Sequence, residues 1–365
     1  MIGHYCRACR GTSGQLVLDL GQQPASDYFP LCDDPGPDPV YPLQMWLCSY
    51  CGLAQLLADP TVPEEPRGAE PAALVAQAEA AVARVGAAGL LPRGALVAEY
   101  GSPHSGSWLP LLMDKELRSA AGTEQADVVL DCFGLMHAAD QAAALSERTS
   151  RLTADGVLLV QFHSLEAILR HGQWNALRHG HYAYYSVTAL TAMLMAVGFT
   201  PRTAWQFDLY GGTVLLAADR GGGEPDACVL ALLKSEAVTG VREPTVLRAL
   251  EDRVQSRAKS LHGWLAGMKA SGRTVVGYGA ASRAVALLRT AGIERDLLAA
   301  VADASPAKNG RRMPGTDIPV IRAAELTEWA PDAVLVFVAD LIEEVRATYP
   351  EIEERGGQWI AADAF

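Results

Sequence analysis

Four cysteines near the start of the chain have the spacing of a metal site. Cys6 and Cys9 form one pair with a gap of two residues, and Cys48 and Cys51 form a second. Two such pairs resemble the knuckles that hold Zn²⁺ in a closed tetrahedral site, where four thiolates leave no position for a catalytic water. A redox pair or an iron–sulfur site uses similar spacing, but nothing else in the sequence indicates electron transfer. We therefore expect a structural zinc site.

Histidines and tyrosines gather in the middle of the chain. His179 and His181 open a tyrosine-rich stretch that ends at Tyr185. Imidazole has a pKa of about 6.5, which suits proton transfer near neutral pH, but such a cluster also fits a hydrogen-bonded core patch, as we expect for His179. His137 follows an apolar run, so it is expected at the carboxyl edge of a sheet, where α/β folds bind ligands. It could equally cap a helix there.

A glycine turn near the C-terminal end could bind an anion. The run YGAASR, from Tyr278 to Arg283, places Gly279 before an expected helix, and Lys308 lies in a later loop that we expect nearby. Backbone N–H groups at a helix start attract anions. A single glycine turn is weak evidence, however, and a solvated loop fits the same residues.

Composition limits the function classes. The chain has 365 residues, 50% of them hydrophobic, and a formal net charge of −12. It has no dense basic stripe, so we expect no nucleic-acid partner. No apolar run approaches the roughly 18 residues of a membrane span and no signal segment is evident, so we expect a cytoplasmic protein without a membrane partner. The oligomeric state is not indicated.

Apolar runs and glycine-rich breaks predict an α/β protein with three domains. A zinc-binding domain is expected at residues 1–58, a truncated Rossmann-like domain at 72–220 and a second Rossmann-like domain at 228–365. Runs at 95–100, 127–133, 155–162 and 211–219 read as buried strands. Helices are expected at 72–91, after Ser186 as an N-cap, and from about 244 to 269.

Several of these segments resemble one known family. CRAC near the start, LCSYCGLAQL (47–56), LRHGHYAYYSVTAL (177–190), VVGYGAASRAVALL (275–288) and VADASPAKNGRRMPGTDIPV (301–320) are similar to signatures of antibiotic-pathway deoxysugar C-methyltransferases. The likeness covers nearly the whole chain. It implies a zinc domain, a central domain that binds S-adenosylmethionine, and a C-terminal Rossmann-like domain. It also implies that His181 is the general base that removes a proton beside a ketone.

The chain departs from the family at the turn that would hold the methyl donor. The family's first strand ends in E-x-G-x-x-x-G; here Glu99 and Gly101 are kept, but Gly106 comes one residue late and His104 stands in the turn. His104 could project into the donor space or cap a helix. Glu99 and Gly101 are therefore interpreted as vestiges of a cofactor site.

The next segment is shorter than the family fold requires. Only 24 residues separate Gly101 from Ala126, whereas one strand–helix–strand crossover takes roughly 30. The second and third strands, which hold the ribose and adenine of the donor in enzymes of this shape, are expected to be missing. This predicts that S-adenosylmethionine is not bound.

The expected substrate pocket also differs from the family. The family's Tyr-His-Glu-His has become Arg178, His179, Gly180 and His181. Near the fourth strand, two positions that are polar in the family are occupied by Phe133 and Met136 in this chain. Where the family has His-Gly-Gly-Ser, this chain has Tyr210 in place of the histidine. We expect Phe133, Met136, His104, Tyr210, Tyr278, Arg283 and Lys308 to contact substrate.

These departures lead to one main expectation and two alternatives. The main one is a donor-independent cyclase or isomerase of specialised (antibiotic) metabolism, acting on a carbonyl-bearing, polyketide-derived intermediate. His181 would act as acid or base, and Arg178 or His137 would polarise the carbonyl. The first alternative is an S-adenosylmethionine-dependent C-methyltransferase of a nucleotide-linked 4-keto-deoxysugar. The second is a non-catalytic scaffold.

Overall fold

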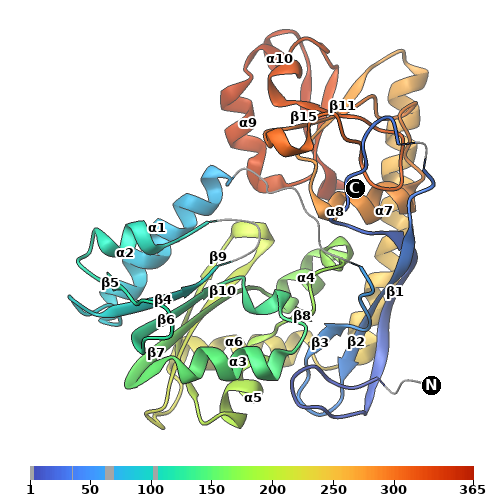
Figure 1. Cartoon of the computed structure of the whole chain (residues 1–365). Coiled ribbons are helices and arrows are strands. Elements are labelled where there is room, and N and C mark those ends of the chain that lie inside the picture. The colour runs from blue at the N-terminus through green and yellow to red at the C-terminus, as the bar shows by residue number, and fades with distance from the viewer. Residues whose placement is uncertain (1–3, 35, 62–69, 102–105) are drawn as a thin grey trace.

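The computed structural model describes residues 4–34, 36–61, 70–101 and 106–365 (Figure 1). In these residues the backbone forms three sheets flanked by helices. The predicted α/β class is confirmed. No helix in the described ranges has the length and apolar character needed to cross a membrane.

The N-terminal sheet is antiparallel, with strand order β1-β2-β3-β8. Its first three strands come from the cysteine-bearing region, but the fourth comes from the His/Tyr-rich stretch in the middle of the chain. Ala54 pairs with Tyr184 and Gln55 with Ala183, so the sheet joins the two regions directly. The strands are β1 (Gly14–Pro24), β2 (Val40–Cys48), β3 (Ala54–Leu56) and β8 (Ala183–Tyr184).

The central sheet has six strands in the order β5-β4-β6-β7-β10-β9. The first four are parallel, and β10 is antiparallel to both of its neighbours. The strands are β4 (Leu96–Tyr100), β5 (Arg118–Ser119), β6 (Ala126–Cys132), β7 (Leu152–His163), β9 (Thr200–Phe207) and β10 (Thr213–Asp219). The predicted strands at 95–100, 127–133, 155–162 and 211–219 correspond to β4, β6, β7 and β10.

Both faces of the central sheet are buried, as its near-continuous apolar strands require. Alternate residues of β7 face opposite layers: Leu158 and Val160 pack with α3, α5 and α6, whereas Val157 and Leu159 pack with α1 and α2. Ser186 caps α5 by accepting from the backbone N–H of Ala189, as predicted. The helices of this region are α1 (Ala72–Ala87), α2 (Leu109–Met113), α3 (Gln141–Ser150), α4 (Leu165–His171), α5 (Val187–Ala196) and α6 (Ala227–Thr239).

The segment between β4 and β6 corrects one expectation. It holds α2 and β5, and β5 pairs in parallel with β4 at the edge of the sheet. Strand β5 therefore occupies the position of the second strand, which was expected to be missing. It fits into the short segment because it is only two residues long and its helix is a single turn.

The C-terminal sheet is parallel throughout, with strand order β13-β12-β11-β14-β15. Helices α7 and α8 cover one face, while α9 and α10 cover the other. The strands are β11 (Val275–Tyr278), β12 (Val301–Asp303), β13 (Val320–Arg322), β14 (Ala333–Val336) and β15 (Gln358–Ala361), and the helices are α7 (Pro244–Ala270), α8 (Ser282–Ala291), α9 (Ile342–Thr348) and α10 (Glu351–Glu354).

The three sheets share contacts that fix the space between them. Strand β1 runs along α7 and reaches the C-terminal sheet (Figure 1), so β1, α7 and α8 share one core. Short 3-10 helices complete the connections: η1 (Leu135–His137), η2 (Trp174–Ala176), η3 (Leu209–Gly211), η4 (Pro306–Lys308), η5 (Ala323–Glu325), η6 (Ala339–Leu341) and η7 (Ala362–Ala364).

Candidate functional site

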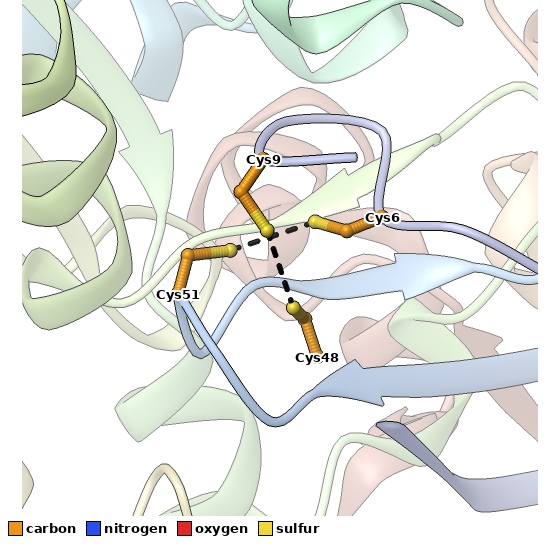
Figure 2. Close-up of side chains that lie close together, drawn as sticks. All are labelled: Cys6, Cys9, Cys48 and Cys51. Atoms are coloured by element: carbon orange, nitrogen blue, oxygen red, sulfur yellow. Dashed lines mark hydrogen bonds between the residues drawn. The ribbon is translucent and has the colours of Figure 1, made fainter. Parts of the chain in front are cut away.

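The four predicted zinc ligands meet at one point. Their Sγ atoms all lie within 4.8 Å of one another, and Figure 2 shows the side chains converging from two loops. The Sγ atoms of Cys6 and Cys51 are 3.5 Å apart, and those of Cys9 and Cys48 are 3.6 Å apart. Sulfurs placed tetrahedrally about 2.3 Å from Zn²⁺ would be separated by about 3.8 Å. The thiols fit a structural zinc ion, as predicted.

Arg7 lies between the first two zinc ligands and ties them to the middle of the chain. Its Nε donates to the carbonyl of Leu56 at 3.1 Å, and its Nη1 donates to the carbonyl of Ala139 at 2.9 Å. Its guanidinium also lies 4.7 Å from the ring centroid of Tyr182. The zinc knuckle therefore contacts both segments that carry predicted catalytic histidines.

The turn before β8 needs a glycine. Gly180 has a φ of +80°, and a Cβ at this position would come within 2.9 Å of Asp27 Oδ2. Its N–H donates to Asp59 Oδ2 at 2.6 Å, and its carbonyl accepts from His137 Nδ1 at 2.9 Å. The departure from the family's glutamate therefore has a backbone reason.

His181 and His137 come from different elements and lie in contact. Their ring centroids are 4.3 Å apart, with the rings at 75°. Arg178 Nε donates to His181 Nε2 at 2.8 Å. A guanidinium can only donate, so His181 Nε2 carries a lone pair and the ring proton is on Nδ1. This neutral imidazole is the form that a general base requires.

The predicted catalytic residues line a cavity of about 240 Å³. One wall comes from the carboxyl edge of the central sheet and the other from the glycine turn after β11. In α/β folds this edge is where ligands bind. The lining includes every described residue that was predicted to act in catalysis or to contact substrate: Phe133, Met136, His137, Arg178, His181, Tyr210, Tyr278, Arg283 and Lys308.

Two aromatic residues of the cavity have unusual backbone conformations. Phe133 has a φ of +60° and Tyr210 a φ of +57°, and bulky residues rarely adopt this region. Their rings meet edge to face with centroids 5.8 Å apart. Strained residues persist where the surrounding structure holds them, and such sites are often functional.

The two predicted cations differ in how they are held. Arg283 lies 5.1 Å from the ring centroid of Tyr210, and no carboxylate of the described residues lies within ion-pair distance of it. Burial, and then the charge of Arg178, lower its pKa. The Nζ of Lys308 instead donates to the carbonyl of Ala280 at 2.7 Å and lies 3.8 Å from Asp303 Oδ2. Arg283 is therefore the cation available to a ligand on this wall.

The structure does not bring Glu99 and Gly101 to the cavity lining. Glu99 accepts from Ser107 Oγ at 2.5 Å and from the N–H of Trp108 at 2.6 Å, so it holds the chain that follows the donor turn. His104 lies outside the described residues.

Sequence reasoning missed two polar residues at the end of β7. Gln161 and His163 both line the cavity. Burial, and then the charge of Arg283, lower the pKa of His163 to about 3, and its Nε2 lies 3.0 Å from Gln173 Oε1. Their position at the carboxyl end of an apolar strand was a usable signal.

The edge of the central sheet has an unsatisfied polar atom. Gln161 Nε2 donates to Gln77 Oε1 at 2.7 Å, while its Oε1 is buried without a hydrogen-bond partner. Buried polar atoms normally have a partner, so this oxygen calls for a donor from a ligand. Gly106, Trp108 and Gln161 all line this part of the cavity, and the oxygen of Gln161 is an acceptor that one donor group of S-adenosylmethionine would satisfy.

Two family models match the chain. The model of the C-methyltransferase C-terminal domain matches residues 208–362, and a zinc binding domain model matches residues 6–65. The second match includes all four cysteines of the metal site. The first includes Tyr210, Tyr278 and Arg283 of the cavity.

One curated relative spans almost the whole chain. The C-methyltransferase NovU of Streptomyces niveus is 24% identical over 405 residues, which cover 97% of this chain and 94% of the relative. Among solved structures, the magnesium protoporphyrin IX methyltransferase of Synechocystis PCC 6803 is 14% identical and covers 41% of this chain and 84% of that one, with a TM-score of 0.31. A TM-score this low carries no argument about function.

These matches correct the main functional expectation. A donor-independent cyclase or isomerase is wrong, because the C-terminal model and the full-length relative are both C-methyltransferases. The expectation that S-adenosylmethionine is not bound is overturned by the same matches, and its structural basis is weakened by β5. The chain thus matches an N-terminal zinc-binding domain and the C-terminal domain of C-methyltransferases, and it is similar over nearly its whole length to a C-methyltransferase.

Proposed function

We propose that the protein is an S-adenosylmethionine-dependent C-methyltransferase that methylates a carbon beside a ketone, and that its substrate is a nucleotide-linked 4-keto-deoxysugar. The observation that carries the proposal is the neutral imidazole of His181, placed beside His137 in a cavity between the two α/β sheets. A hydrogen beside a ketone is acidic enough for imidazole to remove once the developing enolate is stabilised.

His181 removes the proton in this mechanism. The C–H bond breaks, the proton passes to the imidazole, and the electron pair remains on the substrate as an enolate. Arg178 lines the cavity beside His181, and its positive charge stabilises the negative charge that develops on the ketone oxygen. His137 donates its Nδ1 proton to the Gly180 carbonyl, which fixes its ring beside His181. S-adenosylmethionine, when bound, supplies an electrophilic methyl group to the enolate carbon.

The opposite wall accounts for the nucleotide link of the substrate. Arg283 is partly buried at the cavity and has no carboxylate partner among the described residues. A diphosphate would give this guanidinium its missing counter-charge, since arginine binds phosphate through charge-assisted hydrogen bonds. Tyr278 and Gly279 line the cavity on the same wall, and we assign the nucleoside side of the substrate to them.

The test is methyl transfer by the purified, zinc-loaded chain. Thymidine-diphosphate-linked 4-keto-6-deoxyglucose is incubated with S-adenosylmethionine that carries a ¹³C-methyl group, and the product is analysed by NMR. We expect the label on a carbon next to the ketone and equimolar S-adenosylhomocysteine. Label on an oxygen, or no transfer to any nucleotide-linked keto sugar, would show that the proposed substrate class is wrong.

A further inference from the structure

Arg178 makes two side-chain hydrogen bonds that link the two walls of the cavity. Its Nε donates to His181 Nε2 at 2.8 Å, and its Nη1 donates to Ser282 Oγ at 2.5 Å. Ser282 is the first residue of α8, directly after the glycine turn of the C-terminal sheet. One guanidinium therefore contacts both the base and the wall that we assign to the diphosphate.

The bond to His181 uses the atom that a base must offer. Nε2 holds the lone pair of this neutral imidazole, and Arg178 already donates to it. A substrate C–H cannot reach the same lone pair while the guanidinium occupies it. The observed arrangement thus keeps His181 in the correct tautomer but blocks its reactive nitrogen.

The surroundings of Arg178 favour its movement toward an anion. Arg283 follows Ser282 on α8. Burial, and then the charge of Arg178, lower the pKa of Arg283, so the two guanidinium groups repel each other. The carboxyl groups that line the cavity belong to Glu70, Asp303 and Glu344, and none of them forms a hydrogen bond or an ion pair with Arg178. An anion between Arg178 and Arg283 would relieve the repulsion between the two guanidinium groups.

We propose that Arg178 masks the base until substrate binds. In the free protein its guanidinium occupies His181 Nε2, and the diphosphate of the substrate draws the guanidinium onto itself, together with Ser282 and Arg283. The lone pair of Nε2 is then exposed to the carbon beside the ketone. Proton removal becomes conditional on the anionic part of the substrate, and Arg178 acts as a positioning residue. This rests on the proposed function.

Thermodynamic linkage gives the inference a specific signature. If a diphosphate must break the bond between Arg178 and His181, removing the acceptor at position 181 has to strengthen diphosphate binding. The bond involves a charged group and water recovers part of its strength when it breaks, so we expect about a tenfold gain in affinity, which is about 1.4 kcal/mol. A purely structural role of His181 predicts no gain.

Two substitutions at one position separate these cases. His181→Leu removes the acceptor, whereas His181→Gln removes the base but keeps an amide oxygen that can accept from Arg178. Binding of inorganic pyrophosphate and of thymidine diphosphate to the zinc-loaded full chain is measured by calorimetry. We expect His181→Leu to bind both probes about tenfold more tightly than the native chain, and His181→Gln to bind them with nearly native affinity. Arg178→Met should bind both more weakly.

A readout on the base itself completes the test. In the ¹⁵N-histidine-labelled chain, the Nε2 resonance of His181, assigned with His181→Gln, should shift when pyrophosphate is added, and this shift should be absent in Arg178→Met. Equal affinities of the native chain and His181→Leu, no pyrophosphate binding, or binding without the resonance shift would each overturn the inference. None of these results depends on methyl transfer, so failure of the proposed reaction is detected separately by the labelling assay.

Discussion

The two α/β sheets face the same cavity but bring different chemistry to it. The central sheet, with its antiparallel β9 and β10, carries or borders the imidazoles of His137, His163 and His181. The C-terminal sheet is parallel throughout and contributes Arg283 and Lys308. The imidazoles, which can exchange protons, stand on the central wall beside Arg178, whereas the cations named on the C-terminal wall carry fixed charge. The proposed function assigns the reaction to the central wall and substrate binding to the C-terminal wall.

The carboxylates at the edges of the two sheets have a similar role. In the central sheet, Glu99 is bound by Ser107 and by the N–H of Trp108, so it supports a loop. In the C-terminal sheet, Asp303 accepts from the N–H groups of Ala280 and Ser305, so it supports the glycine turn itself. In both sheets the acidic residue orders backbone that borders the cavity.

Replacing the proposed base should have the largest effect. It tests whether the central wall performs the reaction. His181→Gln is expected to lower kcat by about 10²- to 10⁴-fold, the usual contribution of a positioned general base, with a KM within a few-fold of native. Methyl transfer from labelled S-adenosylmethionine measures both constants. Zinc content and circular dichroism serve as controls, and near-native kcat would remove His181 from the catalytic role.

Replacing the cation of the opposite wall should affect binding instead. Arg283→Met keeps the length of the side chain but removes the charge, and we expect KM for the nucleotide-linked substrate to rise about 10- to 100-fold, with a smaller change in kcat. Arg289→Met is the matched control, because Arg289 is on the same helix but is exposed. If Arg283→Met lowered kcat and left KM unchanged, the C-terminal wall would have to take part in the reaction.

Local patterns in the sequence predicted much of the fold and part of the site. The two cysteine gaps predict the zinc site, and the apolar runs predict β4, β6, β7 and β10, because both signals are contained in short stretches of chain. The pairing of β8 with β3 was not predictable, since Ala183 and Tyr184 form a strand only against Ala54 and Gln55. Strand β5 is too short to show a pattern.

The site residues also divide into those that a local pattern predicts and those that depend on contacts between distant segments. His181, Arg178 and Arg283 stand in segments with a recognisable signature, so the sequence predicted them as candidates, and all three line the cavity. Gln161 and Arg7 did not stand out, because their importance comes from partners far away in the chain. Gln161 bonds to Gln77 and Arg7 reaches Ala139, and such pairings are set by how the sheets pack.

The charge of Arg283, on the C-terminal wall, affects the protonation of His163, on the central wall. Its pKa is lowered to about 3 by burial and then by Arg283, while the unfolded chain should show about 6.5. The unfolded state therefore binds more protons between these values, and stability falls as pH drops below about 6.5. Between pH 7 and pH 5 this group should remove about 2 kcal/mol from the free energy of unfolding.

Urea unfolding of the native chain and of His163→Asn at both pH values measures this contribution. The variant should lose less stability on acidification, by about the same 2 kcal/mol. Identical pH dependence of the native chain and His163→Asn would mean that the ring is not held neutral by its surroundings.

Replacing Arg7 tests whether the central wall, with His137 and His181, depends on the zinc-binding region. We expect the smallest effect from this substitution. Arg7→Met removes the bonds to Leu56 and Ala139 and the contact with Tyr182, while the four cysteines remain. We expect full zinc content and a loss in kcat of about three- to tenfold, since the interactions removed are worth on the order of 1 kcal/mol. Hydrogen exchange of the segment 178–184 should quicken in parallel.

The matched control for this variant is Arg10→Met. Arg10 follows the same knuckle, but its guanidinium bonds to Asp140 and is half exposed, so kcat should stay near native. If Arg7→Met kept both native kcat and native exchange, the zinc region would only stabilise its own sheet. If it lost zinc as well, Arg7 would act on the metal site itself. A loss of activity with zinc retained would show that proton transfer on the central wall relies on a side chain held between two zinc ligands.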